Sequence, residues 1–226
     1  MNTLSITHHV REHRSLLARS EKLALVWMAE RLPGWIGPDH LTALGLVAML
    51  LAGGAYWASR YHEGALVLVV ASLALNWFGD SLDGTVARVR KRERPRYGFY
   101  VDHVVDSLSA LFLFGGLALS GYMNPLVALG LLVAYLMVMA ESFLATYARG
   151  IFRLSSFGFG PTELRITLAI GTLYLLYRPL VRLGSYGPFR LFDIGGLVAI
   201  AGLMIALTVS AVRNARALYH EERLQP

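Results

Sequence analysis

Residues 80–106 read DSLDGTVARVRKRERPRYGFYVDHVVD and contain most of the acidic residues that fall in or beside apolar segments. Two sets of residues in this stretch each share one face of a helix. The first set follows the spacing i, i+3, i+4, i+7, i+8 and consists of Asp80, Asp83, Gly84, Ala87 and Arg88. The second set follows i, i+4, i+8 and consists of Gly98, Asp102 and Asp106. Because only a short loop joins the two segments, we expect antiparallel helices whose acidic faces meet.

Four carboxylates in one pocket repel one another unless cations neutralise them. Ligation by carboxylate oxygens alone suits Mg²⁺ or Mn²⁺, and four acids can hold two such ions. The small residues Gly84, Ala87 and Gly98 leave room for a ligand to approach the backbone, and Arg88 can hold a phosphate. Taken singly, glycine and alanine on a membrane helix are more typical of helix packing. The shared register across two helices favours a binding site.

The composition around this stretch is that of a membrane protein. Of the 226 residues 55% are hydrophobic and 16% are charged, against about a quarter charged in soluble domains, and mean hydropathy is +0.50. We predict an all-α membrane protein with one domain, residues 1–226. Its parts are an interfacial amphipathic helix and linker (1–39), a bundle of six transmembrane helices (40–212) and a cytoplasmic tail (213–226). The expected spans are 40–60, 65–88, 98–121, 125–148, 162–178 and 192–212.

The segment before the first span mixes apolar side chains such as Trp27 with basic ones such as Arg31. A helix lying in the headgroup layer fits this mixture, and an amphipathic helix packed on the bundle fits it equally well. Gly34 and Pro38 interrupt the chain before the first span, where Asp39 is a candidate helix cap.

The distribution of basic residues predicts the orientation. The net charge is +6, which in a membrane chain indicates topology and contact with anionic lipid rather than a nucleic-acid partner. With six spans, 17 of the 21 Lys and Arg residues fall on the side of both termini, and the other side holds Arg60, Arg178, Arg182 and Arg190. We therefore expect an integral inner (cytoplasmic) membrane protein with both termini and the acidic site facing the cytoplasm. The chain has no cysteine, which excludes disulfides, thiolate metal sites and a cysteine nucleophile.

At the acidic stretch the sequence resembles the CDP-alcohol phosphatidyltransferase family. The family signature is D-x-x-D-G-x-x-A-R, a spacer, and G-x-x-x-D-x-x-x-D, and every signature residue is present between Asp80 and Asp106. The spacer here is nine residues, one more than the family's usual eight. The resemblance extends to the six-span layout, the interfacial helix and the stretch Pro38-x-x-Leu41-Thr42, in which Asp39 replaces the asparagine that the family often has.

The resemblance implies phospholipid synthesis by phosphoryl transfer from a CDP-linked lipid or CDP-alcohol donor to an acceptor alcohol, with release of CMP. It implies a dinuclear Mg²⁺ or Mn²⁺ site and a homodimer. The implied metal ligands are Asp80, Asp83, Asp102 and Asp106, of which Asp106 is also the general base. The implied cytidine-diphosphate site consists of Asp83, Gly84, Ala87, Arg88, Gly98 and Asp102.

The acceptor is left open between two chemistries. The stretch Pro161-Thr162-Glu163 looks like that of relatives handling choline or ethanolamine, and Glu163 could pair with a cationic amino-alcohol or simply complement the helix dipole. Glu163 and Arg165 are the candidate acceptor pocket. The arginines at 149, 153 and 165 keep an anionic acceptor possible.

Two other classes of function compete with the transferase. Intramembrane acids also line the ion paths of divalent-cation transporters, but these commonly show inverted repeats, and this sequence shows none. Intramembrane prenyltransferases use two separated aspartate-rich motifs in a larger bundle, and neither feature is present. The transferase is therefore the favoured interpretation.

Overall fold

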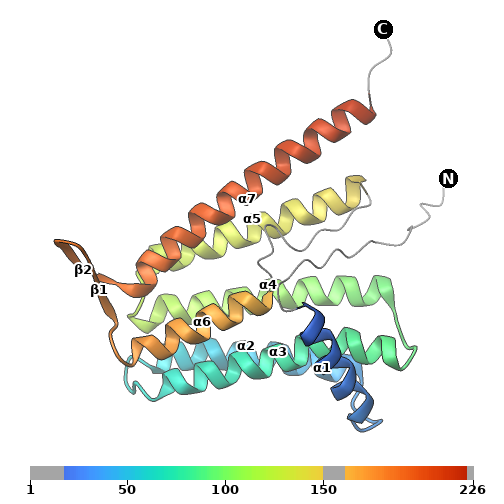
Figure 1. Cartoon of the computed structure of the whole chain (residues 1–226), viewed down its shortest axis with the longest axis horizontal. Helices are drawn as coiled ribbons and strands as arrows, with labels where there is room; N and C mark the ends of the chain where they lie inside the picture. The colour runs from blue at the N-terminus through green and yellow to red at the C-terminus, as the bar shows by residue number, and fades with distance from the viewer. Residues whose placement is uncertain (1–17, 150–160, 223–226) are drawn as a thin grey trace.

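The computed structural model describes residues 18–149 and 161–222. The described chain is mostly helical, with one small antiparallel hairpin near the C-terminal helix (Figure 1). Its elements in order are α1 (Ala18–Arg31), α2 (Pro38–Ala58), α3 (Ala65–Val89), α4 (Pro95–Ser120), α5 (Pro125–Arg149), α6 (Pro161–Leu175), β1 (Leu180–Leu183), β2 (Tyr186–Arg190) and α7 (Leu191–Glu221).

Five described helices are long and apolar enough to cross a membrane, namely α2, α3, α4, α5 and α7. This confirms an all-α membrane protein, but not the count of six spans. The predicted span 162–178 corresponds to α6, whose 15 residues measure about 22 Å at 1.5 Å per residue, less than a hydrocarbon core of about 30 Å. The β1–β2 hairpin follows it and was not predicted. The last helix, α7, continues to Glu221, past the predicted end at residue 212.

Proline marks the beginning of four helices, at Pro38, Pro95, Pro125 and Pro161. Its fixed φ suits the first helical turn, where a missing N–H costs nothing. Asp39 does not cap α2: the cap position is Gly37, whose N–H donates to His40 Nδ1 at 3.0 Å. The position after a proline at the start of the helix lies inside the first turn, so Asp39 is left to interact elsewhere.

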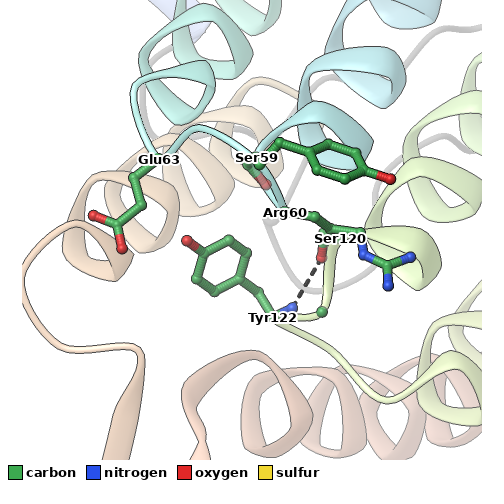
Figure 2. A pocket seen from close by; sticks show the side chains of 7 residues that line it. Ser59, Arg60, Glu63, Ser120 and Tyr122 are labelled. Carbon is green, nitrogen blue, oxygen red and sulfur yellow. Dashed lines mark hydrogen bonds between the residues drawn. The ribbon is translucent and has the colours of Figure 1, made fainter.

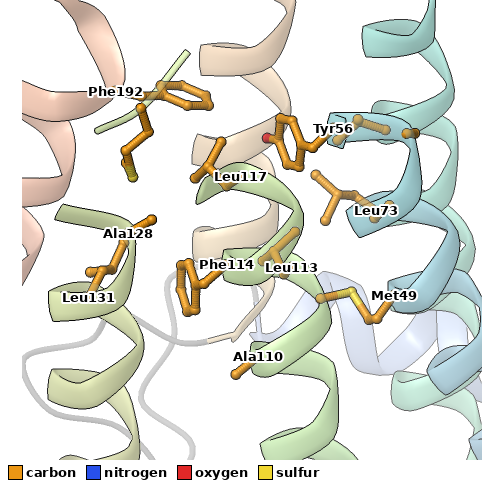
Figure 3. Close-up of a cluster of buried hydrophobic side chains, with 14 of the residues drawn as sticks. Met49, Tyr56, Leu73, Ala110, Leu113, Phe114, Leu117, Ala128, Leu131 and Phe192 are labelled. Carbon is orange, nitrogen blue, oxygen red and sulfur yellow. The ribbon is translucent and has the colours of Figure 1, made fainter. Parts of the chain in front are cut away.

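The main core lies where α2, α3, α4 and α5 meet, and on α4 it begins at Ala110, about one turn beyond Asp106. Figure 3 shows side chains from these helices and from α7 converging, with Tyr56 and Leu117 near the middle. The Tyr56 hydroxyl and Thr172 Oγ1 are 2.6 Å apart in this buried region, so a hydrogen bond ties α2 to α6. The core therefore fixes the relative positions of the helices that carry the site.

Glycines let α2 approach two neighbours at backbone distance. A Cβ at Gly116 of α4 would lie 2.1 Å from the carbonyl oxygen of Gly53 in α2, and one at Gly79 of α3 would lie 2.6 Å from the carbonyl oxygen of Leu41. No larger residue fits between backbones this close. Close crossing on both sides makes α2 the helix against which α3 and α4 are aligned.

A second, smaller apolar cluster attaches α1 to the bundle. Leu25 and Ala29 are buried against Leu41, Leu82 and Val86. On the other face of α1, Leu23 and Trp27 are exposed, which is the pattern expected of a helix at a membrane surface. The packing of α1 is thus established, and its position in the headgroup layer stays a prediction.

Candidate active site

Three of the four motif aspartates come together between α3 and α4. One carboxylate oxygen from each of Asp80, Asp102 and Asp106 lies within 4.8 Å of the other two, and all three residues are partly buried. As the short loop predicts, α3 and α4 run antiparallel (Figure 1), and both pack on α2. Three oxygens at such separations can bind one cation jointly, which is the arrangement that a hard divalent ion requires.

The fourth aspartate, Asp83, lies beside this group and is held by two hydrogen bonds. Thr42 Oγ1 of α2 donates to Asp83 Oδ2 at 2.6 Å, and the Gly84 backbone N–H donates to Asp83 Oδ1 at 2.5 Å. Thr42 belongs to the Pro38-x-x-Leu41-Thr42 stretch, to which the sequence assigned no contact. Its hydroxyl fixes the orientation of the carboxylate, as the hydrogen-bonding partners of metal ligands do.

Arg165 of α6 reaches the same carboxylates. Its Nη2 donates to Asp80 Oδ2 at 2.5 Å in an ion pair whose side chains are 15% and 24% exposed. Its Nε donates to Asn76 Oδ1 at 2.7 Å, and Asn76 Nδ2 donates in turn to the Gly45 carbonyl at 3.0 Å. The guanidinium is therefore held in a fixed orientation at the edge of the acidic group and offsets one of its negative charges.

Of the two residues of the predicted acceptor pocket, Arg165 lies at the acidic group, whereas Glu163 lies in the first turn of α6. An acid at that position complements the helix dipole. Asn76 was not singled out from the sequence, although it precedes Asp80 by four residues and shares its face. This four-residue spacing from Asp80 could have identified Asn76 as a site residue from the sequence.

The small residues of the motif line open space rather than helix contacts. A Cβ at Gly98 would meet nothing within 4 Å, and one at Gly84 would meet only the flexible guanidinium of Arg88. Arg88 Nη2 donates to Thr85 Oγ1 at 3.1 Å, and Ala87 is partly buried on the same face. Helix packing is thus carried by other glycines, and these positions leave the backbone accessible beside the carboxylates.

An ion pair joins the N-terminal ends of α2 and α4 near the site. Arg94 Nη2 donates to both oxygens of Asp39, at 2.7 and 2.6 Å, and its guanidinium lies 4.2 Å from the centre of the Tyr97 ring. The hydrogen bond to Asp39 raises the pKa of the exposed Arg94. Asp39, which replaces the family's asparagine, therefore contacts a residue of the nine-residue spacer.

A pocket of about 410 Å³ lies at the opposite end of the bundle, where α2 and α4 end and α3 begins. Figure 2 shows the hydroxyl of Tyr122 directed toward Glu63 across this pocket. Burial and the Glu63 carboxylate raise the pKa of Tyr122. The pocket contains no residue of the aspartate motif. It is lined by Ser59, Arg60, Tyr61, Glu63, Ser120, Gly121 and Tyr122. The aspartate group is the stronger candidate for chemistry.

Curated relatives were found in two archaea. The chain is 36% identical over 111 residues to an archaetidylinositol phosphate synthase of Methanothermobacter thermautotrophicus, a match that covers 46% of this chain and 53% of the relative. It is 30% identical over 86 residues to the enzyme of the same name in Pyrococcus horikoshii, covering 38% and 43%. The chain thus matches about half the length of these relatives.

A solved structure and a family model cover more of the chain. The fold is similar to that of Mycobacterium tuberculosis phosphatidylinositol phosphate synthase crystallised with CDP-DAG, with a TM-score of 0.59 and 18% identity over 89% of this chain and 98% of that one. The family model for CDP-alcohol phosphatidyltransferases matches residues 35–212, which include the whole acidic group. The chain belongs to the CDP-alcohol phosphatidyltransferase family.

Proposed function

We propose that this protein is a membrane-embedded phosphotransferase of phospholipid synthesis. It transfers a phosphoryl-alcohol group from a CDP-linked donor to an acceptor alcohol and releases CMP. The observation that carries the proposal is the meeting of Asp80, Asp102 and Asp106 within 4.8 Å on the family's motif. A divalent-cation transporter is the competing function, and it is not favoured because the grouped acids belong to the matched family motif and the sequence shows no inverted repeat.

The donor set of the site fits Mg²⁺ or Mn²⁺, because it consists of carboxylate oxygens. Asp80, Asp83, Asp102 and Asp106 would hold two such ions, whose chemistry when bound is to neutralise the diphosphate of the donor. Arg165 pairs with Asp80, and divalent cations would balance the negative charge that remains on the four carboxylates.

The cytidine-diphosphate part of the donor binds along the open side of α3 and α4. Gly84, Ala87 and Gly98 allow close approach to the backbone, and Arg88 pairs with a phosphate. Asp83 and Asp102 complete the site. The acyl or ether chains of a lipid donor extend from here into the surrounding bilayer.

Asp106 is the general base of the reaction. Its carboxylate accepts the proton of the acceptor hydroxyl while the hydroxyl oxygen forms a bond to the β-phosphorus of the donor. The bond from that phosphorus to the bridging oxygen breaks, and CMP leaves with the electron pair. A positioned carboxylate base contributes about 10²–10⁴-fold to such a rate.

The acceptor is a phosphorylated polyol of the inositol phosphate class. Arg165 provides a guanidinium at the edge of the acidic group, and guanidinium is the side chain best suited to hold a phosphate. The relatives named above are archaetidylinositol phosphate synthases, which supports this choice. An amino-alcohol recognised by Glu163 is the alternative.

The site faces the cytoplasm of an inner membrane, and the protein acts as a homodimer. The orientation rests on the 17 basic residues on the side of the acidic site against four on the other. The homodimer rests on the family resemblance. Cross-linking of the full-length protein in native membranes, followed by gel analysis, tests it.

The deciding experiment measures CMP release and product lipids by purified protein in nanodiscs. The donors are CDP-diacylglycerol, its diether counterpart and CDP-ethanolamine, and the acceptors are inositol phosphate, glycerol phosphate, free inositol and diacylglycerol. We expect CMP release and a phosphorylated product lipid with inositol phosphate, both abolished by EDTA and by Asp102→Asn. Release with CDP-ethanolamine alone would replace the acceptor proposal. Mn²⁺ uptake into vesicles without any CMP release would support the transporter.

A further inference from the structure

One carboxylate oxygen connects three helices next to the site. Oε1 of Glu21 in α1 accepts a hydrogen bond from Trp77 Nε1 of α3 at 2.8 Å and another from Thr162 Oγ1 of α6 at 2.8 Å. Glu21 is partly buried. The three residues are far apart in sequence and come together only in the fold, so the contact depends on α1 being docked.

The two donors lie next to the residues that hold the acidic site. Thr162 precedes Arg165 by three residues, about one turn of α6, and Trp77 directly follows Asn76 in α3. Two sets of hydrogen bonds thus attach the start of α6 to α3. In the first, Glu21 bridges Thr162 and Trp77. In the second, Arg165 pairs with Asn76 and Asp80.

Both sets of hydrogen bonds hold the same short helix, α6. A displacement of the first turn of α6 moves Arg165 with it, because the turn is rigid over three residues. A charged acceptor makes stronger hydrogen bonds than a neutral one. Removing the Glu21 carboxylate leaves the part-buried Trp77 indole N–H and Thr162 hydroxyl without this acceptor. Loss of the Glu21 carboxylate would therefore act on the placement of Arg165, about one turn away.

We propose that Glu21 is a positioning residue that sets Arg165 for the acceptor phosphate, so that docking of α1 determines affinity for the acceptor. This rests on the proposed function, in which Arg165 binds that phosphate. The apolar contacts of Leu25 and Ala29 dock α1 on the bundle. Glu21 adds the polar link from α1 to α6.

Kinetics separate this role from a general loss of structure. The variants are Glu21→Ala, Glu21→Gln, whose amide oxygen can still accept both hydrogen bonds, and Glu30→Ala, an exposed acid of the same helix. We expect Glu21→Ala to raise KM for inositol phosphate about 10-fold, the equivalent of one such bond. KM for CDP-diacylglycerol should stay within about twofold. Glu21→Gln should remain within about threefold of the parent, and Glu30→Ala should match it.

A double-mutant cycle tests whether the effect passes through Thr162. Thr162→Val alone should raise acceptor KM, and adding it to Glu21→Ala should raise KM no further, because the bond is already lost. Equal rises in KM for donor and acceptor, or a lowered Tm with unchanged KM values, would overturn the proposal. So would additive effects of the two substitutions.

A distance measurement gives a result that does not depend on activity. The chain has no cysteine, so nitroxide labels can be attached at Leu75→Cys in α3 and Ile166→Cys in α6, both exposed sites. Glu21→Ala should broaden the distance distribution, and Glu21→Gln should not. If the parent protein shows no CMP release with any acceptor, the proposed function fails, while the distances still decide whether Glu21 positions α6. An unchanged distribution in Glu21→Ala would refute the inference.

Discussion

Replacing Thr42 with valine should weaken metal and nucleotide binding without disturbing the fold. The Thr42 hydroxyl has one proton and two possible acceptors, Asp83 Oδ2 at 2.6 Å and the Pro38 carbonyl at 3.2 Å. The shorter contact to a charged oxygen takes the proton. Valine keeps the branched shape and has nearly the same helix propensity, so the substitution removes the hydroxyl and little else.

The size of the effect follows from that single bond. A hydrogen bond to a charged group contributes about 1.5–3 kcal/mol. Thr42 and Asp83 are only partly buried, so water replaces part of the lost interaction, and about 1–2 kcal/mol remains. This corresponds to roughly 5–30-fold weaker binding, in the range seen when partners of metal ligands are removed.

The assay is a Mg²⁺ titration in which thermal stability and cytidine-nucleotide binding are measured at each Mg²⁺ concentration. The Asp83→Asn variant is measured for comparison. Thr42→Ser is the matched control, because it keeps the hydroxyl and should bind Mg²⁺ within about threefold of the parent. Thr42→Val should shift the Mg²⁺ midpoint by the factor given above, with little change in Tm without metal. Equal midpoints for the valine and serine variants would refute the role assigned to the hydroxyl.

Three other outcomes are expected. Asp106→Asn should depress turnover far more than donor affinity, because a base acts in the transition state, and recovery to near-parent turnover at high Mg²⁺ would reduce Asp106 to a ligand. Reporter fusions at Arg94 and at the C-terminus should read cytoplasmic and one at Ser185 should read external, and a reversed pattern would contradict the charge count. Gly116→Ala should lower the free energy of unfolding by about 1–3 kcal/mol, because its Cβ would collide with the α2 backbone. Gly115→Ala, which faces open space, should not lower it, and comparable melting of the two variants would argue against the close crossing.

The grouping of three motif aspartates was predictable because they are local in sequence. Asp80, Asp102 and Asp106 share faces fixed by helical periodicity, and a short loop decides that these faces meet. Arg165 was named as part of a candidate acceptor pocket at the start of the fifth span, and its contact with Asp80 depends on how α6 packs, which no local pattern encodes. Thr42 and Glu21 contribute through contacts between distant segments, so the sequence indicated neither role.

The part of the fold that stays a prediction is the fifth span. Residues 162–178 are apolar enough to suggest a crossing, but the helix ends at Leu175 and a hairpin follows. Hydropathy averages over a window and does not detect where a helix stops. Asp39 shows the same limit: in its own segment it was a candidate helix cap, and its ion pair with Arg94 forms only in the folded chain.

The pairing of Arg165 with Asp80 has a consequence for biogenesis. The α3–α4 hairpin leaves the ribosome with four helical aspartates, and an aspartate costs about 2.5–3.5 kcal/mol to place at the centre of a bilayer by translocon scales. The helix that supplies the guanidinium is made some 60 residues later, or about 3–12 s at ordinary rates of synthesis. During that interval Asp80 has no Arg165 to pair with, and water, metal ions, lipid headgroups or the arginines of the hairpin itself must compensate its charge. A chain truncated before α6 therefore inserts its α3–α4 hairpin with Asp80 still lacking the guanidinium that pairs with it in the complete fold.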